Sequence, residues 1–446
     1  MALKIYNTLS QKEELFIPQK DRLVTLYSCG PTVYSHAHIG NLRAQTFSDT
    51  LRRTLSYLDY EVNQVVNITD VDDKTIKGSQ IEHTTLLEFT KKYEELFFRD
   101  TERMNILRPN VIPRATEYIS EMILLIEKLL EKGLAYKSNN GIYFDIAKSA
   151  GYGTLARLEK RTDTKSRVNN DSYGKESAND FALWKFYREE DGSAVWETPF
   201  GKGRPGWHIE CSAMSMKNLG ETIDIHTGGL DLIFPHHTNE IAQSEGVTGK
   251  KFVRYWMHSG FINMDNEKMA KSVGNIITLD KIIEKGFSPL AYRYFLLEIH
   301  YRKPANFNLE ALEGSQNALE KLYARFMDLG DKNGAVNKQL KEKFINCLEE
   351  DLNTPRALSL VWKALDSNIL DEDKRATILD FDKVLGIGLE KVNRAIIPEE
   401  IKKLSEERER ARIDKNWARA DKIRQKIEVL GYILEDSEKG AKIKKK

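Results

Sequence analysis

Two isolated cysteines and one segment with histidine and glutamate could together bind a metal ion. Cys29 follows a predicted strand, Cys211 lies within the stretch GWHIECSAM, and the segment PHHTNE covers residues 235–240. Because His236 and Glu240 are four residues apart, their side chains would lie on one face of a helix. Thiolate, imidazole and carboxylate are ligand types that zinc accepts in proteins. These residues are therefore candidate zinc ligands.

Spacing alone leaves the choice of ligands open. His237 lies three residues before Glu240, and His208 lies three residues before Cys211, so both also satisfy helical spacing. The chain has no short C-x-x-C pair, and two isolated cysteines are more commonly buried thiols without a metal. The alternative to a metal site is therefore an ordinary buried pair of cysteines.

The stretch HAHIGN, residues 36–41, could bind phosphate. A glycine at a junction between a strand, a loop and a helix lets a ligand approach the backbone, and a helix N-terminus favours an anion. His36, His38 and Asn41 supply hydrogen-bond donors for a polyphosphate. The alternative is an ordinary turn that contains two histidines.

A second candidate phosphate element is KMAKSVGN, residues 268–275. Lys268 and Lys271 are three residues apart, and Ser272 and Gly274 follow them, which indicates a cationic loop. The alternative is a solvated surface loop. Because the chain has no G-x-x-x-x-G-K-[ST] motif, any ATP would be bound differently from ATP in P-loop enzymes.

The elements that must position these residues include a predicted βαβ unit. Residues 22–28 and 61–68 have the pattern of buried strands, and a helical pattern begins near Asn41 between them. This order predicts a parallel sheet with ligands at the carboxyl ends of its strands. Helical periodicity returns over residues 85–104 and 114–132.

The rest of the chain divides into three regions. Residues 135–205 are irregular and polar, which predicts an insertion of short strands and loops. Sheet-like sequence resumes over 221–234, and from Ser288 onward the pattern is almost wholly helical. The sequence therefore predicts an α/β core followed by a helical C-terminal half.

The last long helical segment, residues 401–430, predicts one buried stripe near a 3.5-residue period. The apolar residues of this stripe are Ile413, Trp417, Ala420, Ile423, Ile427 and Leu430. Basic residues are expected on the other faces, namely Arg408, Arg412, Arg419, Lys422 and Lys426. Trp417 is therefore expected in the core, and stacking on a nucleic-acid base is the alternative.

Composition sets limits on the class of protein. The chain has 446 residues, of which 41% are hydrophobic and 30% charged, which predicts two to four domains of a soluble protein. We expect no secretory signal and no membrane span, and three cysteines favour a reducing cytoplasm. The net charge of +1 is uneven: residues 401–446 carry +6 and the other 400 residues carry −5, which favours an anionic partner for the tail. A solvated lysine-rich terminus is the alternative.

Taken together, these motifs resemble a known family. HAHIGN after the first strand and KMAKSVGN before a helical half are similar to the paired signature of class I aminoacyl-tRNA synthetases, and the chain most resembles cysteinyl-tRNA synthetases. Two positions depart from the generic signature, Asn41 in the first motif and Ala270 in the second, and both lysines remain. The matching stretches are CGPTVYSHAHIGN, NITDVDDK, GRPGWHIECSAM, DIHTGGLDLIFPHHTNEIAQSE, KMAKSVGN and WARADKIRQKIEVLGYILEDSEKG.

The resemblance implies a Rossmann-like parallel-sheet catalytic core with an inserted connective domain, followed by an all-α C-terminal half. It divides the chain into six parts. These are the first half of the core (1–125), the connective insertion (126–220), the second half of the core (221–255), the KMSKS loop and helical stem-contact region (256–325), a helical bundle (326–398) and a basic anticodon-binding module (399–446).

The resemblance also implies the roles of individual residues. It assigns one zinc ion per subunit to Cys29, Cys211, His236 and Glu240. The pocket for cysteine is implied at Gly30, Thr69, Trp207 and His226, with core packing as the alternative for Trp207. Contacts to ATP, which would carry Mg²⁺, are implied for His36, His38, Gly40, Asn41, Gly228, Gly229, Asp231, Lys268 and Lys271.

The implied reaction joins L-cysteine to tRNA(Cys) at the expense of ATP, through cysteinyl-adenylate. Zinc would select the thiolate, so no editing domain is needed, and we expect a cytoplasmic monomer. Three alternatives remain: a cysteine ligase of mycothiol synthesis, a silent paralogue that binds nucleic acid, and a structural zinc protein. The segment 400–440 favours tRNA over an amino sugar, and the retained His38 and Lys271 argue against a silent copy.

Overall fold

The structure of the chain is a computed structural model. It describes residues 3–158, 180–264, 267–268, 277–392, 399–437 and 440–445. No helix in these ranges is both long and apolar enough to cross a membrane.

A four-stranded parallel sheet forms the centre of the molecule. Its strand order is β10-β9-β3-β4, and every neighbouring pair is parallel. Strands are confirmed within predicted segments 22–28 and 61–68, whereas only the first part of 221–234 is a strand. The four strands are β3 (Leu23–Ser28), β4 (Glu61–Val66), β9 (Ile223–Gly229) and β10 (Val253–Ser259).

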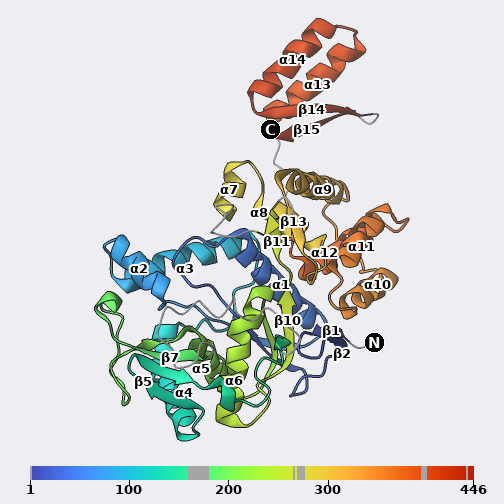
Figure 1. The fold of residues 1–446 in the computed structure, drawn as a ribbon. Helices are drawn as coiled ribbons and strands as arrows, with labels where there is room; N and C mark the ends of the chain where they lie inside the picture. Colours follow the sequence, from blue (N-terminus) through green and yellow to red (C-terminus); the bar gives the residue numbers. More distant parts are fainter. Residues whose placement is uncertain are drawn as a thin grey trace.

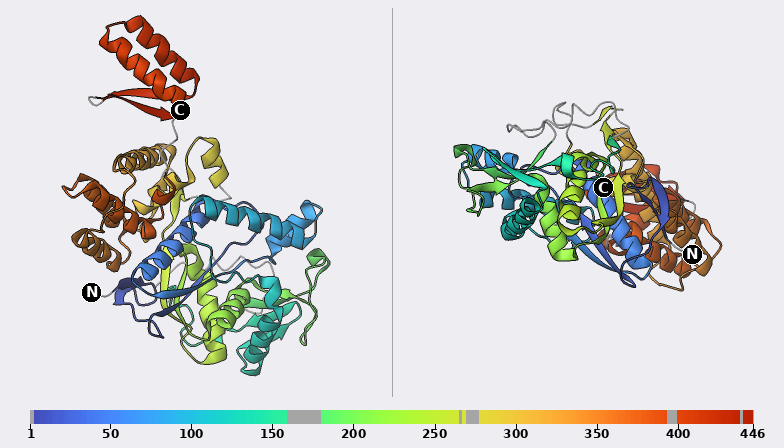
Figure 2. Two further views of the ribbon diagram at one scale, coloured as in Figure 1. Left: turned by 180° about the vertical axis from the view of Figure 1, so that it is seen from behind. Right: turned by 60° about the horizontal axis from the view of Figure 1, so that its bottom comes forward.

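Helix α1 (Ile39–Tyr57) connects β3 to β4 and completes the predicted βαβ unit. The predicted helix over 85–104 is α3 (Leu86–Arg103), which follows the shorter α2 (Asp73–Ile81). The segment 114–132 forms one 3₁₀ turn and then α4 (Ile119–Glu131). Figures 1 and 2 show α2 and α3 extending from the core at one side of the molecule.

The predicted insertion is a second, antiparallel sheet. Its strand order is β5-β6-β7-β8, and its side chains share one apolar core with α4 and α5 (Trp207–Leu219). The strands are β5 (Ala135–Ser138), β6 (Gly141–Phe144), β7 (Phe181–Phe186) and β8 (Gly203–Pro205). Short strands joined by loops are therefore confirmed over 135–158 and 180–205, whereas the polar stretch 159–179 lies outside the described residues.

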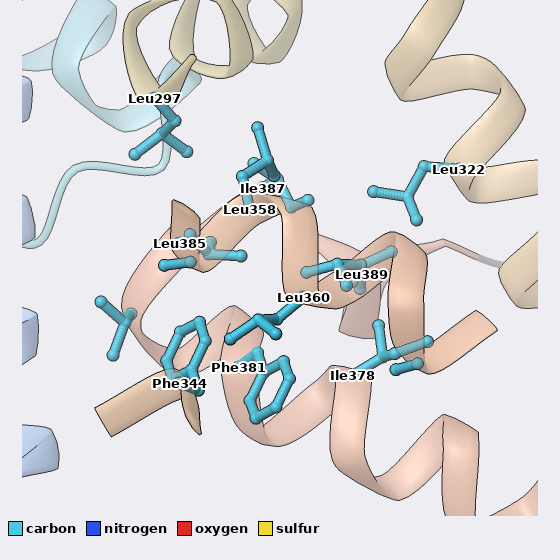
Figure 3. Close-up of a cluster of buried hydrophobic side chains, with 14 of the residues drawn as sticks. Leu297, Leu322, Phe344, Leu358, Leu360, Ile378, Phe381, Leu385, Ile387 and Leu389 are labelled. Atoms are coloured by element: carbon cyan, nitrogen blue, oxygen red, sulfur yellow. The ribbon is translucent and has the colours of Figure 1, made fainter. Parts of the chain in front are cut away.

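The helical half has its own apolar core, which Figure 3 shows. At its centre the rings of Phe344 and Phe381 stack with centroids 4.1 Å apart. Two short strands precede the helical half, β11 (Ile262–Met264) and β12 (Glu267–Lys268), and a third, β13 (Ala305–Phe307), lies between its helices. Its helices are α7 (Leu279–Glu284), α8 (Pro289–Leu297), α9 (Leu309–Asp328), α10 (Lys338–Glu349), α11 (Thr354–Asp366) and α12 (Asp371–Leu385).

A buried ion pair joins α1 to this helical half. The guanidinium of Arg293 on α8 contacts the carboxylate of Asp49 on α1 at 2.6 Å and donates to the carbonyl of Leu385 at 2.7 Å. The hydroxyl of Tyr57, also on α1, donates to Asp380 on α12 at 2.5 Å. Helix α1 is therefore fixed at its C-terminal end by the helical half.

The last part of the chain forms a module of two helices and a hairpin, not helices alone. It contains α13 (Glu399–Ile413), α14 (Trp417–Val429), β14 (Tyr432–Ser437) and β15 (Gly440–Lys445). Figures 1 and 2 show this module standing apart from the rest of the molecule, beyond α9.

The single buried stripe predicted over 401–430 is wrong. A turn around Lys415, which has a φ of 56°, separates α13 from α14, so the residues on either side do not share one helical face. Ala420, Ile423 and Ile427 are buried as predicted. Four other predictions in this segment fail: Ile413, Trp417 and Leu430 are exposed, and Arg408 is buried.

Candidate functional site

A pocket of about 340 Å³ opens at the carboxyl ends of β3, β9 and β10. This is where parallel α/β sheets bind their ligands. Described residues from several predicted motifs line it, including Cys29, Gly30, His36, His38, Gly40, Asn41, Trp207, Gly229 and Asp231, together with Tyr34 and Lys74. The candidate metal site, through Cys29, and the candidate phosphate element HAHIGN therefore line the same cavity.

The four predicted metal ligands come together at the floor of this region. Cys29 follows β3, Cys211 lies on α5, His236 lies in the turn before α6 (Thr238–Thr248), and Glu240 lies in the first turn of α6. One ligand atom from each of the four lies within 4.8 Å of the other three. Three of the residues are buried, and Cys29 is half-buried.

A second set of residues meets the same distance criterion. It shares Cys29 and Glu240 with the first set but takes His226 and His237 in place of Cys211 and His236. The structure therefore places His237 at the site, and helical spacing had left His237 open as a candidate ligand. It also places His226 there, which spacing had not indicated as a metal ligand.

Hydrogen bonds behind the histidines favour the first set. A histidine that binds a metal through one ring nitrogen usually hydrogen-bonds through the other. The Nε2 of His236 lies 3.1 Å from Glu240, and its Nδ1 lies 2.9 Å from Nδ1 of His208. The Nε2 of His226 lies 3.0 Å from Glu240, but its buried Nδ1 has no hydrogen-bond partner among the described residues. The first set is thus the one in which every histidine has this second hydrogen bond, since His226 belongs to the second set.

A chain of histidines continues behind Cys29. The Sγ of Cys29 lies 3.3 Å from Nε2 of His237, whose Nδ1 lies 2.8 Å from Nε2 of His258. The Nδ1 of His258 lies 2.8 Å from the hydroxyl of Thr8. Sequence reasoning missed His258 because no local spacing links it to the site. Only the parallel pairing of β10 with β9, which sets His258 beside Gly228, brings it there.

Without a metal ion, burial favours the uncharged forms of the thiol, carboxyl and imidazole groups of the cluster. Burial, together with the proximity of Cys211 and Glu240, raises the pKa of the Cys29 thiol well above its usual value. Burial raises the pKa of Glu240 to about 7, and it lowers the pKa of His236 to about 3. Such a cluster gains most from a cation, which stabilises the thiolate and carboxylate forms. The donor set therefore fits a bound metal.

His38 and Asn41 cap the helix at the predicted phosphate element. The Nδ1 of His38 accepts from the backbone N–H of Asn41 at 3.2 Å, and the side-chain oxygen of Asn41 accepts from the N–H of His38 at 3.1 Å. Because Nδ1 is an acceptor, the proton of a neutral His38 lies on Nε2. His36 is more open, with 45% of its side chain exposed, and lies 3.8 Å from Asp280.

The second phosphate element lies mostly outside the described residues. Lys271 and Ala270 fall in the range 269–276, which the structure does not describe. Lys268 ends β12, and its side chain is also outside the description. The backbone just after this range is tied to α1, since the N–H of Ile39 donates to the carbonyl of Ile277 at 2.9 Å.

The residues implied for cysteine lie around the cluster. The N–H of Gly30 donates to the side chain of Asn67 at 2.9 Å, and Asn67 donates to the hydroxyl of Thr69 at 3.2 Å. A Cβ at Gly30 would lie 1.7 Å from the carbonyl oxygen of Asn67, so only glycine fits. Trp207 stacks on His236 with centroids 4.2 Å apart and also lines the pocket, so it is more than core packing. His226 is fully buried beneath them.

Three of the residues implied for ATP, Gly228, Gly229 and Asp231, lie at the end of β9 or just after it. Gly229 and Asp231 line the pocket directly. Gly228 lies deeper, where a Cβ would be 2.7 Å from the ring of His237. The HTGGLD stretch thus forms a wall of the pocket and also packs on the histidine cluster.

The chain is similar to known proteins over nearly its whole length. Residues 15–317 match the family model of tRNA synthetases class I (C) catalytic domain. The chain is 44% identical to the cysteine–tRNA ligase of Brachyspira hyodysenteriae, over 99% of both proteins. It is 43% identical to the cysteine–tRNA ligase of Caldicellulosiruptor saccharolyticus, over 99% of this chain and 100% of the relative.

Solved structures support the fold at much lower sequence identity. The methionyl-tRNA synthetase of Mycobacterium tuberculosis, in complex with methionyl-adenylate, aligns over 82% of this chain and 90% of its own, with a TM-score of 0.56 and 15% identity. A LeuRS of Agrobacterium radiobacter aligns over 84% and 85%, with a TM-score of 0.59 and 10% identity.

Proposed function

The chain belongs to the cysteine–tRNA ligase family of class I tRNA synthetases, and we propose that it selects its amino acid with a metal ion held by Cys29, Cys211, His236 and Glu240. As a member of this family it is an ATP-dependent enzyme that joins cysteine to tRNA. The proposal rests on one observation: a ligand atom from each of the four residues lies within 4.8 Å of the others. This cluster adjoins the pocket that the first residues of α1 line.

The selection problem explains why such a site is useful. Cysteine and serine differ by one atom, and a pocket of ordinary side chains discriminates such pairs weakly. One zinc ion per subunit fits the two thiols, the imidazole and the carboxyl. When bound, it would supply direct coordination of the substrate thiolate, which a serine hydroxyl does not match.

The chain's own residues then position the substrate. Gly30 leaves room for the backbone carbonyl of Asn67, and the side-chain amide of Asn67 donates to the hydroxyl of Thr69 and orients it. Trp207 covers His236 and forms one wall of the pocket, so it keeps water away from the thiol end of the substrate. His226 holds the carboxyl of Glu240 through its Nε2.

We propose two reaction steps in this pocket. The carboxylate of cysteine attacks the α-phosphorus of ATP, giving cysteinyl-adenylate and releasing pyrophosphate with its Mg²⁺. A terminal ribose hydroxyl of tRNA then takes the acyl group and releases AMP. His36, His38 and Asn41, with Lys268 and Lys271, would stabilise the charge on the phosphates. Gly40, Gly228, Gly229 and Asp231 would bind the rest of ATP.

The remaining parts of the chain are proposed to bind tRNA. The helical regions 256–325 and 326–398 would contact the tRNA stem, and the basic module 399–446 would contact the anticodon. Trp417 is 59% exposed at the start of α14, which favours base stacking over core packing. We expect a monomer that works in the cytoplasm, where its three cysteines, none of which forms a disulfide, stay reduced.

Charging assays test this function directly. Metal-replete protein is expected to attach labelled cysteine to a tRNA(Cys) transcript and not to an amino-sugar acceptor. Charging of the amino sugar alone would favour a mycothiol-type cysteine ligase. If folded, metal-replete protein charged neither acceptor but still bound tRNA, the silent nucleic-acid-binding alternative would replace the proposal.

A further inference from the structure

Lys74 faces the reaction pocket but has no role in the function described above. It is the only lysine or arginine among the described residues that line this pocket. Its Nζ lies 5.2 Å from the centre of the Tyr34 ring, and Tyr34 lines the same cavity. Lys74 is solvent-exposed, so its ammonium group lies towards the mouth of the pocket rather than at its buried floor.

Two of the three acidic residues that precede Lys74 in the sequence are engaged elsewhere. Asp70 accepts from the backbone and the hydroxyl of Thr116 at 3.0 and 2.5 Å. Asp73 is held by Lys185 at 3.0 Å and by Arg204. Within the described part of the chain, no carboxylate lies within ion-pairing distance of the Lys74 ammonium.

The backbone at Lys74 is firmly held. Its N–H donates to the side chain of Asp72, which caps α2, at 3.0 Å. The next residue, Thr75, is fully buried and closes the capping box. Since Asp73 ties the same turn to β7 and β8, the position of Lys74 relative to the pocket is fixed at the level of the backbone.

We infer that Lys74 binds an oxyanion of the reacting molecules at the mouth of the pocket. An unpaired ammonium beside a site for carboxylate and phosphate groups is a point charge suited to either. Two sources carry this chemistry: the carboxylate or phosphate of the small substrates, and a phosphodiester near the 3′ end of tRNA. The inference rests on the proposed function, because it takes both reaction steps as occurring in this pocket.

The test compares three variants of the full-length, metal-replete protein. Lys74→Met removes the charge, Lys74→Arg keeps it, and Lys77→Met is the matched control, because Lys77 is exposed on α2 but does not line the pocket. Each variant is assayed for cysteine-dependent pyrophosphate exchange and for single-turnover transfer from preformed adenylate to tRNA. Loss of one charge-assisted contact predicts a fall of about tenfold or more in kcat/KM or in the transfer rate.

We expect this fall for Lys74→Met in one of the two assays, with most of the activity restored in Lys74→Arg and no change in Lys77→Met. A fall in exchange assigns the anion to the small substrates, and a fall in transfer alone assigns it to tRNA. The inference is overturned if Lys74→Met equals Lys77→Met in both assays, or if Lys74→Arg is as defective as Lys74→Met. Absence of exchange and transfer in the wild type would instead contradict the proposed function itself.

Discussion

At the scale of single residues, the site depends on what lies behind each donor. Cys29 and Glu240 belong to both possible ligand sets, so they do not distinguish them. Cys211 belongs only to the proposed set, whereas His237 belongs only to the other set. The only histidine of the proposed set, His236, has a partner on its second ring nitrogen, whereas in the other set His237 has one and His226 does not.

Replacing Cys211 by Ser is expected to abolish stoichiometric metal binding, because it removes one of two thiolates. His237→Gln is expected to weaken binding by about 10- to 100-fold at most, as a loss of outer-shell support. Metal content and the sulfur-to-metal absorption of the Co²⁺-substituted protein measure both effects. Wild-type affinity in Cys211→Ser, together with metal loss in His237→Gln, would assign the metal to the second set.

Gly30→Ala tests the close approach of two backbones below the pocket. The new Cβ would meet the carbonyl oxygen of Asn67 at 1.7 Å, so this backbone must move and carry Thr69 with it. We expect kcat/KM for cysteine in pyrophosphate exchange to fall by at least about tenfold. The control is Gly314→Ala on α9, where a Cβ meets nothing within 4 Å. That variant should keep full activity and gain about 0.5–1 kcal/mol in the free energy of unfolding, and equal losses in both variants would refute the explanation.

At the scale of elements, α2 is attached to the connective sheet through Asp73. Its carboxylate contacts Lys185 on β7 and Arg204 on β8, and Arg204 also contacts Asp191 at 2.7 Å. Burial opposes ionisation of Asp73, but the two cations together hold the pKa of its carboxyl below the usual value. This pair of contacts fixes the end of α2 that carries Lys74.

The contribution of Asp73 to the free energy of unfolding should decrease as the pH falls. Because its pKa is lower in the folded than in the unfolded chain, the contribution is present above about pH 4 and is lost as the pH falls through the folded-state pKa. Asp73→Asn should therefore lower the free energy of unfolding by about 1 kcal/mol near neutral pH, since the side chain is 48% exposed and partly screened.

Thermal unfolding of both proteins across the acid range measures this difference, which should shrink below about pH 4. A difference that stays constant down to the lowest pH would contradict the assigned role of the charge. Asp366→Asn, at a surface pair with Arg325, is the control and should change the free energy of unfolding by less than about 0.5 kcal/mol.

The sequence predicted elements better than it predicted where helices end. Strand β3, helix α1 and strand β4 followed from periodicity, because long buried runs carry a strong pattern. The stripe around Trp417 failed because the turn at Lys415, which takes a positive φ, was not recognised within a continuous helical pattern. His258 could not be predicted, since the pairing of β10 with β9 is a long-range property of the sheet.

At the scale of the whole molecule, the pocket at the carboxyl ends of the parallel strands and the basic module are widely separated. Figures 1 and 2 show the module of α13, α14 and the hairpin standing beyond α9, away from the sheet that carries the pocket. Such an arrangement suits a long ligand that is held at two distant points. The module should therefore affect tRNA binding without affecting chemistry on small substrates.

Trp417→Ala separates these two contributions. Because Trp417 is exposed, its loss should leave stability and cysteine-dependent exchange unchanged, while KM for tRNA rises by about tenfold through lost base stacking. Val429→Ala is the control, since Val429 is 86% exposed at the other end of α14. An unchanged KM for tRNA in Trp417→Ala would remove this residue from the nucleic-acid surface.

The most direct test of metal-based selection is amino-acid-dependent pyrophosphate exchange with cysteine and with serine, before and after chelation. We expect exchange with cysteine and little or none with serine, loss of the cysteine signal on chelation, and its return when zinc is restored. Undiminished, cysteine-specific exchange by protein shown to be free of metal would contradict metal-based selection.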